Sequence, residues 1–257
     1  MKSSRIILVL ITVIFLLSST QIIHPNYQRE KSIYNQNLSE IFDGVHRFID
    51  YKHGKFSMLE IYDESNKTAV LFLHGRGLNP NEQNLINPMR VALSELGNNT
   101  YSIQLPVLAK GATYNEYIKI FSNSSYRIQE SLNYILEKNT NIILIAHSCG
   151  VHMLMDFIDN FNLPNEVSSL VLIGSGAVDK GQKLIEPYPY SKISPPILDL
   201  YGEFDFDLVI KQSKIRLNKI KKVNMKSSQI MIKSSDHYHT DNAKVVIDLV
   251  KKWLSNQ

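Results

Sequence analysis

The chain has 257 residues, of which 44% are hydrophobic and 20% charged, so it can bury the core of one α/β domain and does not have the composition of a disordered protein. Its formal net charge of +4 comes from 28 basic and 24 acidic side chains, and so small an excess predicts no nucleic-acid partner. The single cysteine, Cys149, excludes an internal disulfide framework and a cysteine-rich zinc site.

The N-terminus has the pattern of an export signal. Lys2 and Arg5 precede an apolar run from Ile6 to Leu17, and small polar residues follow that run. A helix of this length spans roughly 18 Å, short of the ~30 Å hydrocarbon core, although counting on through Ile23 gives an uncleaved anchor as the alternative. We therefore expect residues 1–24 to be a signal peptide or an N-terminal membrane anchor. The protein is then exported, periplasmic or extracellular, or held at the membrane by this segment.

Residues 25–44 are rich in Asn, Gln, Ser and Tyr and show little periodicity, which predicts a linker leading into a domain of residues 45–257. The domain begins with a predicted β-hairpin, in which Val45 to Tyr51 and Phe56 to Tyr62 flank the turn KHGK. The run TAVLFLHG that follows is short, apolar and ends in glycine, which is typical of a strand buried on both faces.

Strands and helices alternate through the rest of the chain. The further predicted strands are TYSIQLP, NIILIA, VSSLVLIGSG, PPILDLYG and SQIMIK, and the predicted helices cover residues 82–96, 114–138, 149–161, a basic stretch within 211–226, and 242–254. This alternation predicts an α/β fold with a mostly parallel central sheet, an antiparallel edge hairpin and helices on both faces. Few residues separate VLIGSG from PPILDL, so we expect no large cap domain there.

Ser148 stands in the string IAHSCG, where a buried strand must turn sharply into a helix. The small residues Ala146 and Gly150 allow the strand and the helix to approach each other closely. The string has the form of a nucleophile elbow, G-x-S-x-G, with alanine at the first small position. A serine that merely caps the helix N-terminus is the alternative.

A serine hydroxyl is a poor nucleophile unless a base takes its proton and an acid orients that base. In the order typical of a nucleophile elbow, the acid comes next and follows a later strand. Asp205 lies just after the strand PPILDL and its turn glycine, and it is our choice for the acid. Asp207 and Glu203 are alternatives, and each of the three would otherwise be an exposed loop acid.

The base is expected after the strand SQIMIK, in the string SSDHYHTD. His237 is preferred to His239, and either would otherwise be an exposed loop histidine. Two histidines and two carboxylates in this string also suit zinc, but no H-E-x-x-H motif or cysteine partner supports a metal site. We therefore expect no metal.

Two backbone N–H groups should bind the oxyanion that forms when serine attacks a carbonyl. The N–H of Cys149, at the helix N-terminus, is expected to be one of them. The other should come from the loop LFLHGRGLNP, where Arg76 is the expected donor. The Arg76 side chain either faces solvent or attracts an anionic group of the substrate.

From Val45 to the C-terminus the chain resembles the α/β-hydrolase superfamily, in the stretches LFLHGRG, IAHSCG, LYGEFD and SSDHYH. The run from LHGRGLNP to TYSIQLP is also similar to an exported bacterial group of this superfamily that has no assigned function. The resemblance implies the fold and the catalytic layout and gives no substrate. The segment PVLAKGATYNEY follows the fourth strand and either lines part of the substrate pocket or is a surface loop.

These observations predict a serine hydrolase that cleaves an ester or related acyl bond through an acyl-enzyme, with Ser148, Asp205 and His237 as its triad. The expected substrate is a small-molecule or lipid acyl compound, and no cofactor is implied. The alternative is a catalytically silent α/β-hydrolase-fold protein with a binding or envelope-associated role, because a fold alone does not establish a function.

Overall fold

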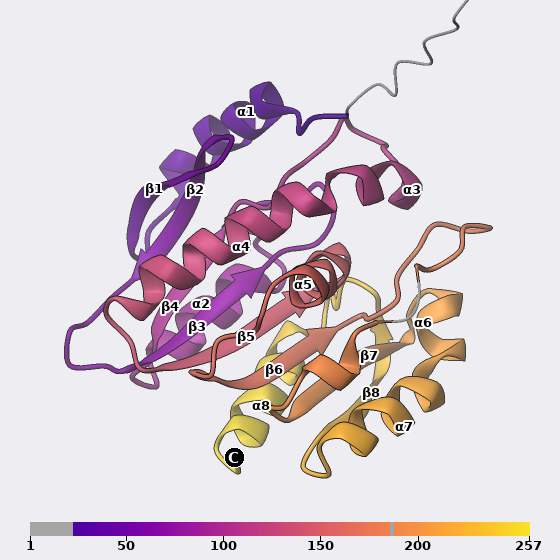
Figure 1. Ribbon diagram of the computed structural model, residues 1–257. Coiled ribbons are helices and arrows are strands. Elements are labelled where there is room, and N and C mark those ends of the chain that lie inside the picture. The colour runs from indigo at the N-terminus through magenta and orange to yellow at the C-terminus, as the bar shows by residue number, and fades with distance from the viewer. Residues whose placement is uncertain (1–22, 186–187) are drawn as a thin grey trace, which may run out of the picture.

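The computed structural model describes residues 23–185 and 188–257, which form one eight-stranded sheet with helices packed against it (Figure 1). The strand order is β1-β2-β4-β3-β5-β6-β7-β8. The strands are β1 (Val45–Tyr51), β2 (Gly54–Ile61), β3 (Thr68–Leu73), β4 (Asn99–Ile103), β5 (Asn141–His147), β6 (Val167–Ile173), β7 (Ile197–Phe204) and β8 (Ser228–Asp236).

The sheet is parallel except at one edge. There β1 and β2 form the predicted antiparallel hairpin, and β2 also pairs antiparallel with β4, whereas every pair from β4 to β8 is parallel. Parallel strands need long crossover connections, and the helices between the strands supply them. This architecture is the α/β-hydrolase fold, and it confirms the predicted fold class.

Helices cover both faces of the sheet, as Figure 1 shows. Successive strand residues point to opposite faces, so Ala69 and Leu71 of β3 enter one apolar cluster with α4 and α5, whereas Val70 and Phe72 enter a second with α2 and α8. The helices are α1 (Tyr27–Asn37), α2 (Ile86–Ser94), α3 (Tyr114–Tyr117), α4 (Phe121–Leu136), α5 (Cys149–Asn160), α6 (Asp207–Lys211), α7 (Ser213–Val223) and α8 (Ala243–Leu254), with 3-10 helices η1 (Leu38–Glu40), η2 (Ile118–Ile120) and η3 (Tyr190–Lys192).

Two helices differ in extent from the prediction. The helix expected over 82–96 begins only at Ile86, because the Glu82 carboxylate accepts hydrogen bonds from the N–H groups of Asn84, Leu85 and Ile86 and caps its first turn. The helix expected over 114–138 is divided by η2 into α3 and α4.

Most of the segment 25–44, for which a linker is predicted, forms α1 and η1, and part of it packs on the domain. The Asn26 side chain caps α1 by accepting from the N–H of Arg29 at 2.9 Å. Glu30 is buried and forms an ion pair at 3.0 Å with Arg127 of α4, whose side chain is fully buried. Composition did not indicate this packing, because the buried Glu30 is bonded to Arg127, which is distant in the sequence.

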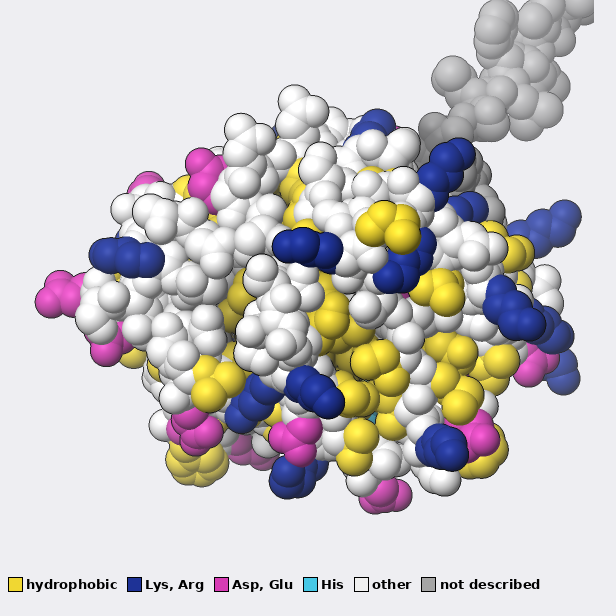
Figure 2. Space-filling model, turned by 90° about the horizontal axis from the view of Figure 1, so that it is seen from below, with side chains coloured by type: hydrophobic (Ala, Val, Ile, Leu, Met, Phe, Trp, Pro, Cys, Tyr) yellow, Lys and Arg dark blue, Asp and Glu magenta, His cyan; other side chains and the backbone are white. Residues whose placement is uncertain are grey.

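Of the predicted signal peptide or anchor, all but the last two residues lie outside the described part of the chain. Among the described residues, no helix is both long enough and apolar enough to span a bilayer. In Figure 2 the face seen from below carries Lys and Arg side chains interspersed with Asp and Glu.

Between β6 and β7 the described residues contain only the short helix η3, so there is no large cap, as predicted.

Candidate active site

The fold brings Ser148, Asp205 and His237 together at one edge of the sheet. These residues follow β5, β7 and β8, which are parallel and therefore end at the same edge. The His237 Nε2 atom lies 2.7 Å from Ser148 Oγ, and its Nδ1 atom lies 2.6 Å from Asp205 Oδ1. All three residues are buried, so these hydrogen bonds form largely out of contact with water.

Ser148 has φ 55° and ψ −119°, in a region that L-residues rarely adopt. Such a conformation costs on the order of 1–3 kcal/mol and persists only where the surrounding structure imposes it. Its N–H donates to the carbonyl of Ile173 at 2.8 Å, which ties the turn to β6. At Gly150 a Cβ atom would lie 2.5 Å from the carbonyl oxygen of Leu73, so only glycine allows α5 to start this close to β3. The strand-turn-helix geometry is that of a nucleophile elbow.

The Asp205 carboxylate is held from several directions. It accepts from the N–H groups of Phe206 at 2.7 Å and Gly202 at 3.2 Å, in addition to His237. Burial alone would raise the pKa of Asp205. The effect of burial is outweighed by the hydrogen bond and charge of His237 and by these N–H groups, so the pKa of Asp205 is lowered. The carboxylate is therefore ionised at neutral pH, and His237 donates to it through Nδ1, which leaves Nε2 free to accept from the Ser148 hydroxyl.

The two alternative acids lie elsewhere. The Asp207 side chain is 92% exposed and pairs with Lys211 at 3.4 Å, one helical turn away. Glu203 accepts from the N–H of Ser234 at 2.8 Å. Among the three acids of this loop, Asp205 is thus the one in contact with a histidine.

The alternative base, His239, is bonded to a different serine. Its Nδ1 atom lies 2.7 Å from the hydroxyl of Ser235, and φ at His239 is 53°. Because His237 and His239 have different partners, the string SSDHYHTD does not converge on one point. No group of three or more His, Cys, Asp or Glu side chains within residues 23–185 and 188–257 is arranged to hold a metal ion.

The two expected oxyanion donors both line the pocket beside Ser148. Cys149 is the first residue of α5, where the N–H groups have no partner within the helix. Its thiol is buried, which raises its pKa to about 12, so the thiol is protonated and unsuited to act as the nucleophile.

His74 fixes the peptide that carries the Arg76 N–H. The ring accepts from the N–H of Leu105 through Nε2 at 3.0 Å, so Nδ1 is protonated and donates to the carbonyl of Gly75 at 2.7 Å. A peptide group is planar and trans, so fixing this carbonyl also fixes the direction of the Arg76 N–H on the opposite side. Arg29 of α1 holds the same loop by donating to the carbonyl of Gly77 at 3.1 Å.

The side chain of Arg76 is paired with a carboxylate of the protein and is not free in solvent. It forms two hydrogen bonds of 2.6 Å with the carboxylate of Asp179, after β6. Asp179 also accepts from the backbone N–H of Tyr114 at 2.7 Å, at the start of α3. The hydrogen bond with Arg76 lowers the pKa of Asp179, so three loops around the pocket are joined through one ionised carboxylate.

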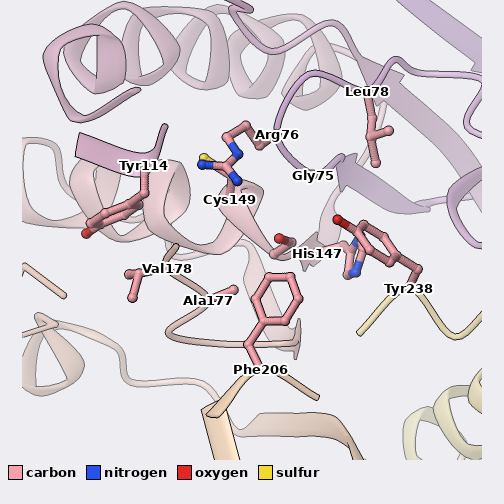
Figure 3. A pocket seen from close by; sticks show the side chains of 11 residues that line it. Gly75, Arg76, Leu78, Tyr114, His147, Cys149, Ala177, Val178, Phe206 and Tyr238 are labelled. Atoms are coloured by element: carbon pink, nitrogen blue, oxygen red, sulfur yellow. The ribbon is translucent and has the colours of Figure 1, made fainter. Parts of the chain in front are cut away.

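A cavity of about 40 Å³ adjoins Ser148. Figure 3 shows Tyr114 and Val178 on one side of Cys149, with His147 and Tyr238 on the other and Phe206 between the two sides. The Phe206 ring stacks on His237 with ring centroids 4.1 Å apart, which restricts rotation of the imidazole. The sequence did not predict Phe206, Val178 and Tyr238 as residues of the pocket. Tyr114 belongs to the segment PVLAKGATYNEY, which was predicted either to line part of the pocket or to be a surface loop.

Four further histidines, named here the buried histidines, surround this site or its supporting loops. Burial is the largest cause that lowers the pKa of each, to about 3 for His147 and to about 4 for His74, His152 and His239. All four are therefore neutral at pH 7. The Nε2 atom of His147 donates to the carbonyl of His237 at 3.1 Å, which supports the backbone of the histidine next to Ser148.

Comparison with solved structures agrees with the fold. The chain is similar to the esterase Pf2001 of Pyrococcus furiosus, with a TM-score of 0.67 and 16% identity over 86% of this chain and 95% of that one. It is also similar to Est1E from Butyrivibrio proteoclasticus, with a TM-score of 0.60 and 15% identity over 82% and 98% of the two chains. For the carboxylesterase CesB of Bacillus subtilis the TM-score is 0.62, with 12% identity over 90% and 98%.

These neighbours are members of the α/β-hydrolase superfamily, and at such low identity they establish the fold alone. No family model matches the chain. No curated protein matches it in sequence either. The resemblance to an exported group of unassigned function therefore stays a prediction.

Proposed function

We propose that this protein is a serine hydrolase that cleaves an ester or related acyl bond. The observation that carries the proposal is the buried hydrogen-bonded array in which His237 lies 2.7 Å from Ser148 Oγ and 2.6 Å from Asp205. The elbow geometry at Ser148 and the adjoining pocket support it, because a nucleophile must be reachable by a substrate. Esterases among the similar structures are consistent with the same reaction class.

In the proposed reaction, His237 takes the proton of the Ser148 hydroxyl as the oxygen attacks the carbonyl carbon of the substrate. Asp205 holds the imidazole in the required tautomer and stabilises the imidazolium. The N–H groups of Arg76 and Cys149 bind the oxyanion. His237 then gives its proton to the leaving alcohol, and an acyl-enzyme on Ser148 remains.

Water completes the cycle. His237 removes a proton from a water molecule that attacks the acyl-enzyme, and it returns that proton to Ser148 as the carboxylic acid leaves. Base catalysis of this kind contributes on the order of 10² to 10⁴ in rate, and one oxyanion donor on the order of 10² to 10³. No step needs a cofactor or a metal.

The proposal includes export, on the basis of the N-terminal pattern of Lys2, Arg5 and the apolar run after them. The substrate would then be a small-molecule or lipid acyl compound outside the cytoplasm. Determining the N-terminal residue of the protein recovered from its native cell separates a cleaved signal peptide from a retained anchor.

Labelling with a fluorophosphonate probe tests the mechanism, since this reagent modifies an activated serine. The purified full chain is compared with Ser148→Ala, His237→Ala and the matched control Asp207→Ala, which removes an acid outside the array. We expect labelling of the wild type and the control and none of the other two. A folded wild-type protein that is not labelled would contradict the proposal and favour a catalytically silent binding protein.

A further inference from the structure

The pocket beside Ser148 is closed at one end by Tyr114. This side chain is 2% exposed and lines both that cavity of about 40 Å³ and a second one of about 120 Å³. Among the other residues that line the second cavity, Ile118, Phe121 and Tyr188 are apolar or aromatic, and Asp156 and Asp159 are acidic. Among the described residues Tyr114 is the one that the two cavities share, so its side chain is the wall between them.

Tyr114 is held in place at both ends. Its N–H donates to Asp179 at 2.7 Å, and its hydroxyl accepts from the N–H of Ile185 at 3.1 Å. The ring also packs on His152, with ring centroids 4.7 Å apart. A side chain fixed at its backbone, ring and hydroxyl does not move aside at low cost, so the wall is a rigid one.

The direction of proton transfer decides which part of an ester faces this wall. The leaving oxygen must lie within hydrogen-bond reach of His237 Nε2, so the alcohol occupies the side of the pocket near His237 and Tyr238. The acyl group then points the other way, toward the side where Figure 3 shows Tyr114 and Val178. A groove of about 610 Å³ along the start of α6 is bordered by both Phe206 and Val178, so it does not distinguish the alcohol side of the pocket from the acyl side.

From this geometry we infer that Tyr114 restricts the acyl group to short chains, so that the substrates are short-chain acyl esters. The inference rests on the proposed function and adds its substrate class. Because a methylene that does not fit costs roughly 10-fold or more in discrimination, the restriction is expected to be steep.

The test measures kcat/KM of the full-length protein on p-nitrophenyl acetate, butyrate, hexanoate and octanoate, which differ only in the acyl chain. For the wild type we expect a fall of about 10-fold or more from acetate to hexanoate. In Tyr114→Ala the two cavities join, and each methylene that enters the joined space favours binding about fourfold. The ratio of hexanoate to acetate activity should therefore rise about 10-fold or more.

Two variants serve as matched controls. Ile118→Ala enlarges the second cavity without opening it to Ser148, and Tyr114→Phe removes only the hydroxyl. Both should keep the wild-type ratio within about twofold, because the ring still separates the cavities. A change in Ile118→Ala as large as that in Tyr114→Ala would overturn the assignment of the wall to Tyr114.

Two further outcomes also overturn the inference. One is a wild type that hydrolyses octanoate as fast as acetate, and the other is a folded, active Tyr114→Ala that keeps the wild-type ratio. If Tyr114→Ala does not fold, Tyr114→Leu shortens the wall with less loss of packing. A ratio of hexanoate to acetate activity that stays at the wild-type value in this variant would then overturn the inference. Failure of the proposed function is distinct, because it would abolish hydrolysis at every chain length together with probe labelling of Ser148.

Discussion

The buried ion pair between Glu30 and Arg127 leads to a prediction about the N-terminal helix. Arg127 is fully buried, and its Nη2 atom donates to the two Glu30 carboxylate oxygens at 3.1 and 3.0 Å and to the Tyr51 hydroxyl at 3.1 Å. Its Nη1 atom donates to the carbonyl of Gln104 at 2.8 Å. The change Glu30→Gln keeps the shape of the side chain and removes the charge opposite the guanidinium.

Removing one partner of a buried pair costs about 3–5 kcal/mol, because the remaining charge is left uncompensated inside the protein. Glutamine can still accept a hydrogen bond, so we expect the free energy of unfolding to fall by about 3 kcal/mol, the low end of that range. For a domain of this size such a loss lowers the melting temperature by about 6–12 °C. The matched control is Asp248→Asn, in an exposed pair with Lys244, which should cost no more than about 0.5 kcal/mol.

Urea unfolding followed by the fluorescence of Trp253, the single tryptophan, measures both variants. Burial raises the pKa of Glu30, which indicates that the ionised carboxylate is costly in this place. The double change of Glu30→Leu with Arg127→Leu should therefore recover much of the loss. If Glu30→Gln unfolds like the wild type, residues 25–44 behave as the linker that their composition suggested, and the reasoning is refuted.

Three further predictions concern the site and its surroundings. Asp205→Asn should lower kcat/KM of ester hydrolysis by about 10⁴ with the fold retained, whereas Asp207→Asn should leave it nearly unchanged; equal losses would contradict the assignment of the acid. Gly150→Ala should destabilise the protein by about 3 kcal/mol in urea unfolding, since the added methyl group overlaps the carbonyl of Leu73, and a wild-type midpoint would count against that contact. The pKa values of the buried histidines lie below those in the unfolded chain, so the unfolded state binds more protons between about pH 4 and 6.5. Stability should therefore fall from pH 7 to pH 5, by about 1 kcal/mol or more per histidine, and a flat pH profile would show that these side chains are accessible to water.

The fold was predictable because its signals are local. The apolar runs of β3 and β5 and the turn glycines after several strands lie within stretches of ten residues or fewer, and alternation of strands with helices limits how they can be arranged. Ser148 was found in the same way, because an elbow is a sequence-local structure. The order of Asp205 and His237 followed from the expectation that each comes after a later strand.

What the sequence did not reveal depends on contacts between distant segments. The helix α1 owes much of its packing to Arg127, and the pocket wall owes its position to the contact of Tyr114 with Asp179. Neither the contact of α1 with Arg127 nor that of Tyr114 with Asp179 can be predicted from the residues next to it in the sequence. The preference for Asp205 over Asp207 rested on a small difference in spacing, whereas in the structure one side chain is buried against His237 and the other is exposed.

The place of β8 in the sheet has a consequence for how the protein would lose activity. Among the described strands it lies at the edge of the sheet and pairs with β7 alone, and His237 comes immediately after its last residue. Edge elements open at a lower free energy than central ones, so β8 can detach while β3 and β5 stay paired. Such opening withdraws the histidine from Ser148 and leaves the rest of the domain intact. If the protein hydrolyses esters as proposed, this activity should be lost at a lower denaturant concentration than the fold, and it would then report local opening of β8.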